Sequence, residues 1–464
     1  MKSLNCLLSL RALKMRSILF SAMLFAAVLF PSIPTLSQNS VWAWGGNSAS
    51  QLGDLSWGGF STQPVWVFDI SDVSAISAGS SHSVALKEDG TVWDWGYCLT
   101  GSSYPCWSYP RQVSGISDVA AIAAGGDNFS LALKNDGTVW RWDIESPIPT
   151  QVPDLNNVVS VAAGFAHCLA VKSNGTVWAW GSNYSGQLGD GTNENRNIPV
   201  QTLYLSDVIA VVGGRTHSLA FKSDGTVWAW GGNYYGQLGD GTNEDKNIPI
   251  QASGLSSIIA LSAGGGYALA LKEDGTVWAW GNNYNGQLGD GTKENKNIPV
   301  KAMNISDVQA ISAGYNHSLA LKNDGTVWAW GGNQGGQLGD GTQENRDIPV
   351  QASTVSNAIA ISAGGDHSLS ILPKAITPPT VASIQKLTDP FRLKISGSDF
   401  NKDIVVFIGY QLYEAWDNVS YKNEETIILK KGKKLKKAFP EGQCTSIRLL
   451  NPDGGYTITV FKRN

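Results

Sequence analysis

A pair of tryptophans separated by one residue recurs seven times along this chain, and the last four pairs lie 50 residues apart. The pairs contain 14 of the 18 tryptophans and occupy positions 42/44, 93/95, 140/142, 178/180, 228/230, 278/280 and 328/330. A fixed period of about 50 residues indicates one supersecondary unit that is stacked repeatedly. We therefore expect a repeat fold.

One copy of the repeat shows what the unit contains. Asp324-Gly325 supplies the positive φ angles of a tight hairpin. Trp328 and Trp330 should lie on the same face of a strand, because side chains alternate along it. Four strands per repeat are typical of a propeller blade. The strand-like runs of this copy cover residues 308–313, 318–322, 326–330 and 348–350.

The two ends of the repeat region complement each other. Residues 41–45 look like a third strand without a first or second strand before it, and residues 361–372 look like a first and second strand without a third. Joining them completes one more blade and closes the ring, which protects the strand edges. The predicted fold is all-β, with a seven-bladed β-propeller over residues 41–374.

Three linked segments carry a family resemblance: Ala-Gly-x-x-His-Ser-Leu-Ala-Leu, Asp-Gly-Thr-Val-Trp-Ala-Trp-Gly and Gly-Gln-Leu-Gly-Asp-Gly-Thr. Together they resemble the regulator of chromosome condensation repeat of the bacterial, secreted type. The third segment is absent after Trp95 and Trp142. Trp93-Asp94 imitates the signature of another propeller class, but the other copies carry Ala or Arg in place of Asp94, so we interpret it as accidental.

The ends of the chain differ from the repeats. Residues 1–38 resemble a signal peptide, because a 13-residue apolar run follows several basic residues and is too short to span a bilayer comfortably; an uncleaved anchor is the alternative. Residues 375–379 form a Pro-rich linker, and residues 380–464 predict a small β-sandwich that resembles the IPT/TIG immunoglobulin-like domain of bacterial surface proteins. The expected location is extracellular, periplasmic or the cell surface.

Cysteine, charge and histidine patterns bound the chemistry. Cys98 and Cys106 could close a disulfide in an exported chain, with two unpaired thiols as the alternative. A net charge of −4 does not favour nucleic acid as a partner. The mature chain is expected to lack a membrane span and to be a monomer.

The histidines share one repeat position with Phe129 and Tyr267, which favours packing over catalysis or metal binding. No catalytic residue, cofactor or metal is predicted.

Two polar segments have competing interpretations. The loop at residues 190–195 offers oxygen ligands but lacks the spacing of a known calcium loop, so we interpret it as a solvated turn. The lysine-rich run at residues 430–437 could contact an anionic surface, but an exposed hairpin is the simpler interpretation.

The repeats differ most at two sets of loop positions. These are the residues between Ala-Gly and His, and the tip of the loop between the third and fourth strands, including Gln334-Gly335. Strand parity places both sets at one end of the barrel. Loops on a rigid scaffold are common binding sites, and Tyr and Arg are common in them. The candidate binding face contains Phe165, Tyr184, Arg215, Tyr234, Tyr235, Tyr284, Tyr315, Asn316 and Asp366. Neutral drift at exposed turns is the alternative.

The leading functional hypothesis is an exported, non-enzymatic scaffold that binds a protein through this face. The resemblance adds two special cases. Some relatives exchange guanine nucleotide on a small GTPase, which an export signal argues against, and the propeller-type β-lactamase inhibitor blocks a secreted enzyme. The rival is a carbohydrate-binding or carbohydrate-active propeller, which would need acidic or aromatic residues converging on one pocket.

Overall fold

The computed structural model describes residues 39–56, 58–96, 107–126, 128–143 and 146–373, and seven strands between residues 380 and 462. The described residues belong to two compact units that divide between Leu372 and Pro373. Several sequence predictions lie outside the described residues: the signal peptide, the Cys98–Cys106 pair, the linker at 375–379 and the lysine-rich run at 430–437. Within the described part, no helix is long and apolar enough to cross a membrane.

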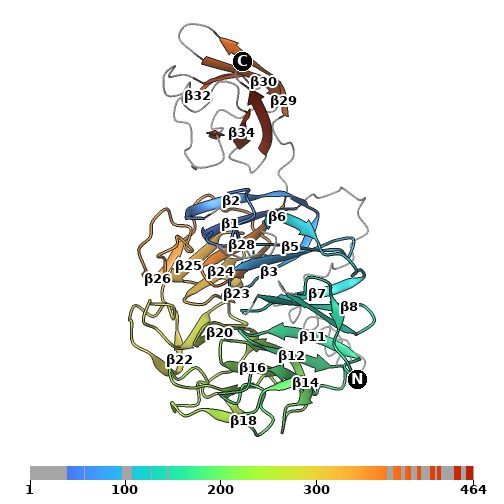
Figure 1. The fold of residues 1–464 in the computed structure, drawn as a ribbon. Helices are drawn as coiled ribbons and strands as arrows, with labels where there is room; N and C mark the ends of the chain where they lie inside the picture. Colours follow the sequence, from blue (N-terminus) through green and yellow to red (C-terminus); the bar gives the residue numbers. More distant parts are fainter. Residues whose placement is uncertain are drawn as a thin grey trace, which may run out of the picture. The chain divides into compact units, whose positions relative to one another are not determined.

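The described strands of the first unit form seven four-stranded antiparallel sheets, which follow one another around a ring (Figure 1). We number the blades in chain order. Blade 1 contains β3 (Val73–Ala78), β4 (His82–Lys87), β5 (Val92–Gly96) and β6 (Trp107–Gln112). Blade 2 contains β7 (Val119–Ala124), β8 (Phe129–Lys134), β9 (Val139–Asp143) and β10 (Thr150–Gln151). Blade 3 contains β11 (Val158–Ala163), β12 (His167–Lys172), β13 (Val177–Gly181) and β14 (Arg196–Gln201).

The next three blades repeat the same order. Blade 4 contains β15 (Val208–Gly213), β16 (His217–Lys222), β17 (Val227–Gly231) and β18 (Lys246–Gln251). Blade 5 contains β19 (Ile258–Ala263), β20 (Tyr267–Lys272), β21 (Val277–Gly281) and β22 (Lys296–Lys301). Blade 6 contains β23 (Val308–Ala313), β24 (His317–Lys322), β25 (Val327–Gly331) and β26 (Arg346–Gln351). The strands of blade 6 agree with those predicted from its sequence to within two residues.

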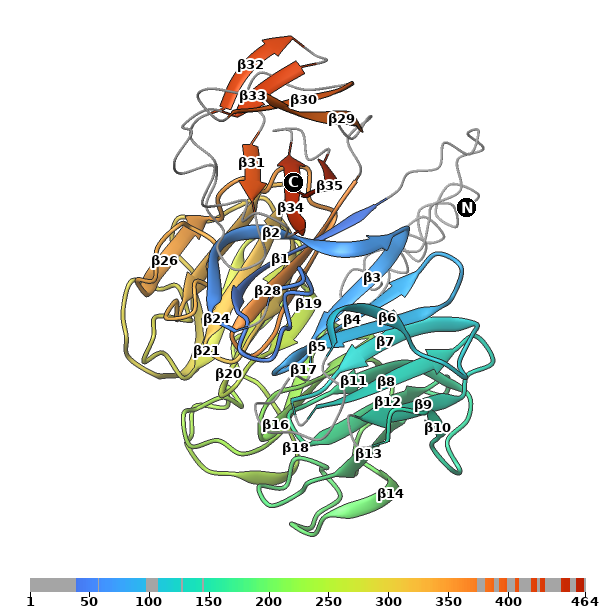
Figure 2. The same ribbon diagram turned by 45° about the horizontal axis from the view of Figure 1, so that its top comes forward.

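Blade 7 joins the two ends of the repeat region and closes the ring. It contains β27 (Ala360–Ala363), β28 (His367–Leu372), β1 (Ser40–Gly46) and β2 (Phe60–Ser71). Blue β1 lies beside orange β28 in Figure 2, and the two strands pair from Ser40 with Leu372 to Gly45 with His367. The prediction of seven blades closed by both ends is confirmed.

The second tryptophan of each pair builds the core between blades. Trp44, Trp95, Trp142, Trp230, Trp280 and Trp330 are almost completely buried. In most copies the first tryptophan is only half-buried, and the lysine that ends the second strand lies over its ring, as Lys172 does over Trp178 at 4.3 Å. The second member of each pair therefore fills the core, and the first member does so only partly.

The described strands of the second unit form two antiparallel sheets. One contains β29 (Thr380–Leu387), β30 (Arg392–Ser398), β33 (Thr426–Leu429) and β32 (Val419–Asn423). The other contains β31 (Val405–Ile408), β34 (Cys444–Leu450) and β35 (Tyr456–Lys462). The described part of this unit consists of strands, and its assignment to the IPT/TIG class remains a prediction.

Candidate functional site

A central channel of about 280 Å³ runs between the first strands of the blades. Small and apolar residues such as Ala123, Ala163 and Ser312 line it. Of the described residues along this channel, Arg215 alone carries a charged side chain. The one charged group of the described lining therefore lies at the mouth of the channel.

Strand register confirms which loops share an end of the barrel. His167 at the start of β12 pairs with Gly181 at the end of β13, so the turn before His167 and the loop after Gly181 are neighbours. Val171 pairs with Val177 beside the Asn174-Gly175 hairpin, at the opposite end. The two variable sets thus lie on one face, which we call the loop face.

Main-chain hydrogen bonds between neighbouring blades hold the inner rim of the loop face. The amide of Phe165 donates to the carbonyl of Gly214 at 3.0 Å, and the amide of Arg215 donates to that of Gly264 at 3.2 Å. The amide of Tyr315 donates in the same way to Gly364 at 3.0 Å. These three rim residues are therefore positioned by the next blade as well as by their own.

Three predicted residues from blades 3, 4 and 6 meet at the channel mouth. The guanidinium of Arg215 lies 5.5 Å from the ring centroid of Phe165 and 5.2 Å from that of Tyr315. The two rings are 6.4 Å apart in an edge-to-face arrangement. These distances are typical of cation–π contacts. We call Phe165, Arg215 and Tyr315 the mouth cluster.

Tyrosines from two adjacent blades form a second group on the loop face. The rings of Tyr234 and Tyr235 are 4.9 Å apart, and those of Tyr235 and Tyr284 are 5.9 Å apart. Tyr234 is 75% exposed and Tyr284 61% exposed, so most of their surface faces solvent. Tyr184 is 78% exposed at the equivalent position of blade 3. Large, exposed aromatic side chains of this kind commonly anchor partners.

The other two predicted residues, Asn316 and Asp366, also form backbone hydrogen bonds within their blades. The carbonyl of Asn316 accepts a hydrogen bond from Gly332 N at 2.7 Å, and the carbonyl of Asp366 accepts one from Gly46 N at 2.7 Å. Desolvation raises the pKa of the Asp366 carboxyl above its ordinary value. Their side chains remain on the loop face, but their backbones are occupied by contacts within blades 6 and 7.

Blade 2 has one residue more in this turn than the other blades. The repeat pattern predicts Asp127-Asn128 as its variable pair. However, Gly126 N donates to Gly164 O at 3.1 Å, which is the bond that Phe165 makes in blade 3. Gly126 therefore occupies the rim position. A Cβ there would lie 2.3 Å from the ring of Phe165, so this glycine makes room for the mouth cluster.

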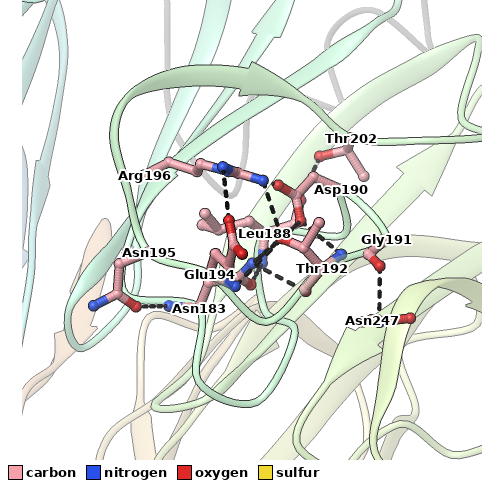
Figure 3. Close-up of polar contacts among 10 residues, drawn as sticks. All are labelled: Asn183, Leu188, Asp190, Gly191, Thr192, Glu194, Asn195, Arg196, Thr202 and Asn247. Atoms are coloured by element: carbon pink, nitrogen blue, oxygen red, sulfur yellow. Dashed lines mark hydrogen bonds and ion pairs between the residues drawn. The ribbon is translucent and has the colours of Figure 1, made fainter.

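The loops between the third and fourth strands are held by internal polar contacts, as Figure 3 shows for blade 3. Asp190 Oδ1 accepts hydrogen bonds from Asn183 Nδ2 and Thr192 Oγ1, and Asp190 Oδ2 pairs with Arg196 Nε at 2.9 Å. Both carboxylate oxygens thus have protein donors. Among the described residues, no group of three or more His, Cys, Asp or Glu side chains could hold a metal ion. The loop is a rigid support for Tyr184.

The histidines are buried between blades. His167 Nε2 lies 2.9 Å from Ser218 Oγ, and Ser218 Oγ also donates to the carbonyl of Gln187 at 2.8 Å. Because the serine proton is used for Gln187, the histidine is expected to donate from Nε2. Burial lowers the pKa of His167 to about 3, so its imidazole is neutral. The same pairing joins His82 to Ser130, His317 to Ser368 and His367 to Ser83.

Blades 2, 4 and 5 vary this interblade pair. Phe129 faces Cys168, whose buried thiol is free. Tyr267 has its hydroxyl 3.0 Å from Ser318 Oγ. The blade after His217 carries Ala268 at the position where the other blades carry Ser or Cys. His217 therefore lacks the serine partner. These variations agree with a packing role for the ring.

Asp94 has a structural function that its sequence context did not suggest. In most blades the second tryptophan donates to the carbonyl of a Gln in the preceding loop, as Trp230 does to Gln187 at 2.8 Å. Blade 1 lacks the Gly-Gln-Leu-Gly segment in its sequence, and Trp142 donates instead to Asp94 Oδ2 at 3.1 Å. Asp94 also pairs with Arg111 at 3.0 Å. Trp93-Asp94 is therefore a local replacement for the missing loop.

Comparison with known proteins places these features in a family. A family model described as the RCC1-like domain matches residues 102–370, and a model of the Regulator of chromosome condensation (RCC1) repeat matches residues 73–97. The probable E3 ubiquitin-protein ligase HERC6 of Homo sapiens is 36% identical over 183 residues, which are 34% of this chain and 18% of that protein. The RCC1 domain-containing protein RUG3, mitochondrial, of Arabidopsis thaliana is 32% identical over 96 residues, 19% and 22% of the two chains. The matched parts span about a fifth of each relative.

Solved structures agree with the fold. The crystal structure of Prp20p from Saccharomyces cerevisiae superimposes with a TM-score of 0.67 at 22% identity, covering 77% of this chain and 94% of that one. Human WBSCR16 superimposes with a TM-score of 0.66 at 23% identity, covering 73% of this chain and 100% of that one. At these identities the likeness establishes the propeller fold alone.

Proposed function

The chain belongs to the RCC1-like domain family, and from that premise we propose that it is an exported scaffold that binds a protein partner through its loop face. The observation that carries the proposal is the gathering of the variable residues. The mouth cluster and the tyrosines at 234, 235 and 284 come from four blades, yet they lie on one face of a rigid ring. A rigid scaffold with exposed aromatic residues and an arginine suits recognition.

Protein partners are described for one structural relative. The Prp20p structure is reported with that protein's binding properties to Gsp1p and histones. For this chain we infer the same general class of ligand, a protein, and export would place that partner outside the cytoplasm. Inhibition of a secreted hydrolase is a special case of this function. The ligase activity in the name of HERC6 is not part of the proposal, because the match covers 18% of that protein.

A pull-down from the extracellular fraction of the producing cells tests the binding face. The test variant replaces Phe165, Arg215, Tyr234 and Tyr315 with Ala. The matched control replaces four exposed residues of the opposite hairpins with Ala, namely Glu88, Asn135, Ser173 and Glu273. We expect the control to recover the same partner as the wild type and the test variant to lose it. Equal recovery by both variants would reject the loop face.

Export has a separate test. N-terminal sequencing of the chain recovered outside the cells should begin near residue 39, beyond the apolar run. Recovery of the chain only inside the cells, with its first residues intact, would reject export and would bring guanine-nucleotide exchange back into consideration. This outcome would not affect the loop face as a binding surface.

A carbohydrate ligand is the second candidate, because three equivalent tyrosines on adjacent blades are exposed. Tyr184, Tyr234 and Tyr284 could stack on successive sugars of a polymer. Binding on a glycan array that disappears in Tyr234→Ala/Tyr235→Ala would favour this candidate over a protein partner.

A further inference from the structure

We propose that the partner presents a carboxylate, the side chain of a Glu or Asp in a protein loop, to Arg215 at the mouth of the channel. This inference rests on the proposed function and specifies the chemistry of its ligand. The carboxylate would accept hydrogen bonds from the guanidinium while the partner's neighbouring residues lie on the exposed tyrosines.

The geometry around Arg215 prepares it for such a ligand. Its side chain is exposed, and its guanidinium lies near the rings of Phe165 and Tyr315, at 5.5 and 5.2 Å. Aromatic neighbours restrain the orientation of the guanidinium, so less side-chain entropy is lost on binding. A planar guanidinium that is restrained in this way can form two parallel hydrogen bonds to one carboxylate.

The charge of Arg215 is not matched within the described chain. Arg111, Arg196 and Arg346 each pair with an aspartate within 3.0 Å. No described carboxylate forms an ion pair with Arg215. It is also the one charged side chain among the described channel-lining residues. An arginine that is held by rings and lacks a described carboxylate partner is complementary to one external anion.

The surroundings favour a single carboxylate over a phosphate or a nucleic acid. Polyanions are bound by several cations together, and the described channel lining has one. The neighbouring Tyr315 is partly buried, and desolvation raises the pKa of its hydroxyl while Arg215 opposes that shift. A protonated tyrosine beside the arginine can donate a further hydrogen bond to a carboxylate.

A peptide library tests the proposal while the partner is still unidentified. Phage-displayed heptapeptides are selected on the wild-type full chain, and the best peptide is synthesised with a fluorescent label. Its affinity is then measured by anisotropy for the wild type, Arg215→Gln, Arg215→Lys, Tyr234→Ala and the control Lys301→Gln. Lys301 is exposed near the opposite hairpins, and its substitution changes the net charge by the same amount.

We expect the selected peptides to share one Glu or Asp. Arg215→Gln should weaken binding at least tenfold, and replacement of the shared acid by its amide should have the same effect. Combining the two changes should cause no further loss, because both remove one interaction. Arg215→Lys should give an intermediate loss, because an ammonium lacks the planar fork. Lys301→Gln should bind like the wild type.

The outcomes separate the two proposals. Peptides without a shared acid, or binding by Arg215→Gln within twofold of the wild type, would overturn the carboxylate site. If Tyr234→Ala still abolished binding in that case, the loop face would stand. If neither variant mattered, the proposed function would fall as well. Near-UV circular dichroism and the melting temperature of each variant verify that the propeller is folded.

Discussion

At the scale of single residues, the neighbouring blade determines whether a buried polar side chain has a hydrogen-bond partner. The ring at the start of each second strand pairs with a residue of the next blade, namely the one that follows that blade's own ring. His317 pairs in this way with Ser368. A sequence alignment of the repeats shows that both positions vary, but only the structure shows that they vary as partners. The pairing joins residues about 50 positions apart, so no local pattern could reveal it.

The first prediction concerns His217, whose partner position in the next blade holds Ala268 instead of a serine. Ala268→Ser should raise the free energy of unfolding by about 1 kcal/mol, because the new Oγ can accept from His217 and donate to the Gln237 carbonyl. This arrangement copies that of Ser218 between His167 and Gln187. Urea unfolding followed by tryptophan fluorescence measures the change.

Ser218→Ala is the matched control for this pair. It leaves His167 Nε2 without its serine partner and should lower the free energy of unfolding by about 1–3 kcal/mol. If Ala268→Ser destabilised the chain as much as Ser218→Ala, the site would lack room for a hydroxyl and the pairing rule would be wrong.

The second prediction concerns Asp94, which is 1% exposed. Asp94→Ala should lower the free energy of unfolding by about 1–3 kcal/mol, because it removes the carboxylate that pairs with Arg111, whose own side chain is 29% exposed. It also removes the acceptor of Trp142 Nε1. Asp94→Asn should cost less, since an amide oxygen can still accept that bond.

The ion pair between Arg141 and Asp143 provides the comparison, because the Arg141 side chain is 44% exposed. Asp143→Asn should change stability by at most about 1 kcal/mol, as is usual for surface pairs. A loss for Asp94→Ala no larger than this would show that Asp94 does not replace the missing loop. Thermal and urea unfolding of the three variants decide the question.

At the scale of strands and loops, much of the binding face could be predicted. Alternation and hairpin signals fix which loops share an end of a blade, and the register of His167 with Gly181 confirms it. The contact of Phe165 with Tyr315 could not be predicted, because these residues belong to blades 3 and 6. They meet only because the ring curves around a narrow channel, which depends on the packing of all blades.

The third prediction concerns the loop that carries Tyr234 and Tyr235. Asn233 is completely buried, and its Oδ1 accepts from the amide of Leu238 at 2.9 Å. Asn233→Ala should cost about 1–3 kcal/mol, because this buried amide loses its acceptor. Hydrogen exchange measured by mass spectrometry should accelerate over residues 234–242 and stay unchanged in the equivalent loop of blade 3.

Asn243→Ala provides the control within the same loop. Its exposed side chain donates to the Tyr234 carbonyl at 3.2 Å, so its loss should change exchange little. Equal acceleration by both variants would show that the loop is not organised around Asn233. If only Asn233→Ala accelerates exchange, weaker partner binding by this variant would reflect a loosened tyrosine loop.

At the scale of the whole molecule, closure makes the ring one cooperative unit. Trp44 near the start of the repeats donates to the carbonyl of Gln337 near their end at 2.9 Å, and β1 completes the last blade. The blade count could be predicted because the two partial blades in the sequence must sum to a whole one. Five histidines lie in one belt within this unit, so their protonation is linked to unfolding of the ring as a whole.

The fourth prediction is that the propeller loses stability as the pH falls below about 6.5. Burial lowers the pKa of His82, His167, His317 and His367 to about 3 and that of His217 to about 4. Between these values and 6.5, the unfolded chain binds protons that the folded chain does not. Each histidine should then remove up to about 1.4 kcal/mol of stability per pH unit.

A histidine variant isolates the contribution of this belt from that of the other titrating groups. His317→Tyr copies the arrangement of Tyr267 and removes one of the five groups. Urea unfolding between pH 7.5 and 4.5 gives the dependence of stability on pH, and its slope between about pH 6 and 4.5 should decrease by about one fifth in this variant, because four such groups remain. An unchanged slope would mean that His317 is protonated in the folded ring, which its burial at 0% exposure opposes. The belt thus makes the ring more stable at neutral pH than at acidic pH, because every imidazole is then a neutral spacer between blades.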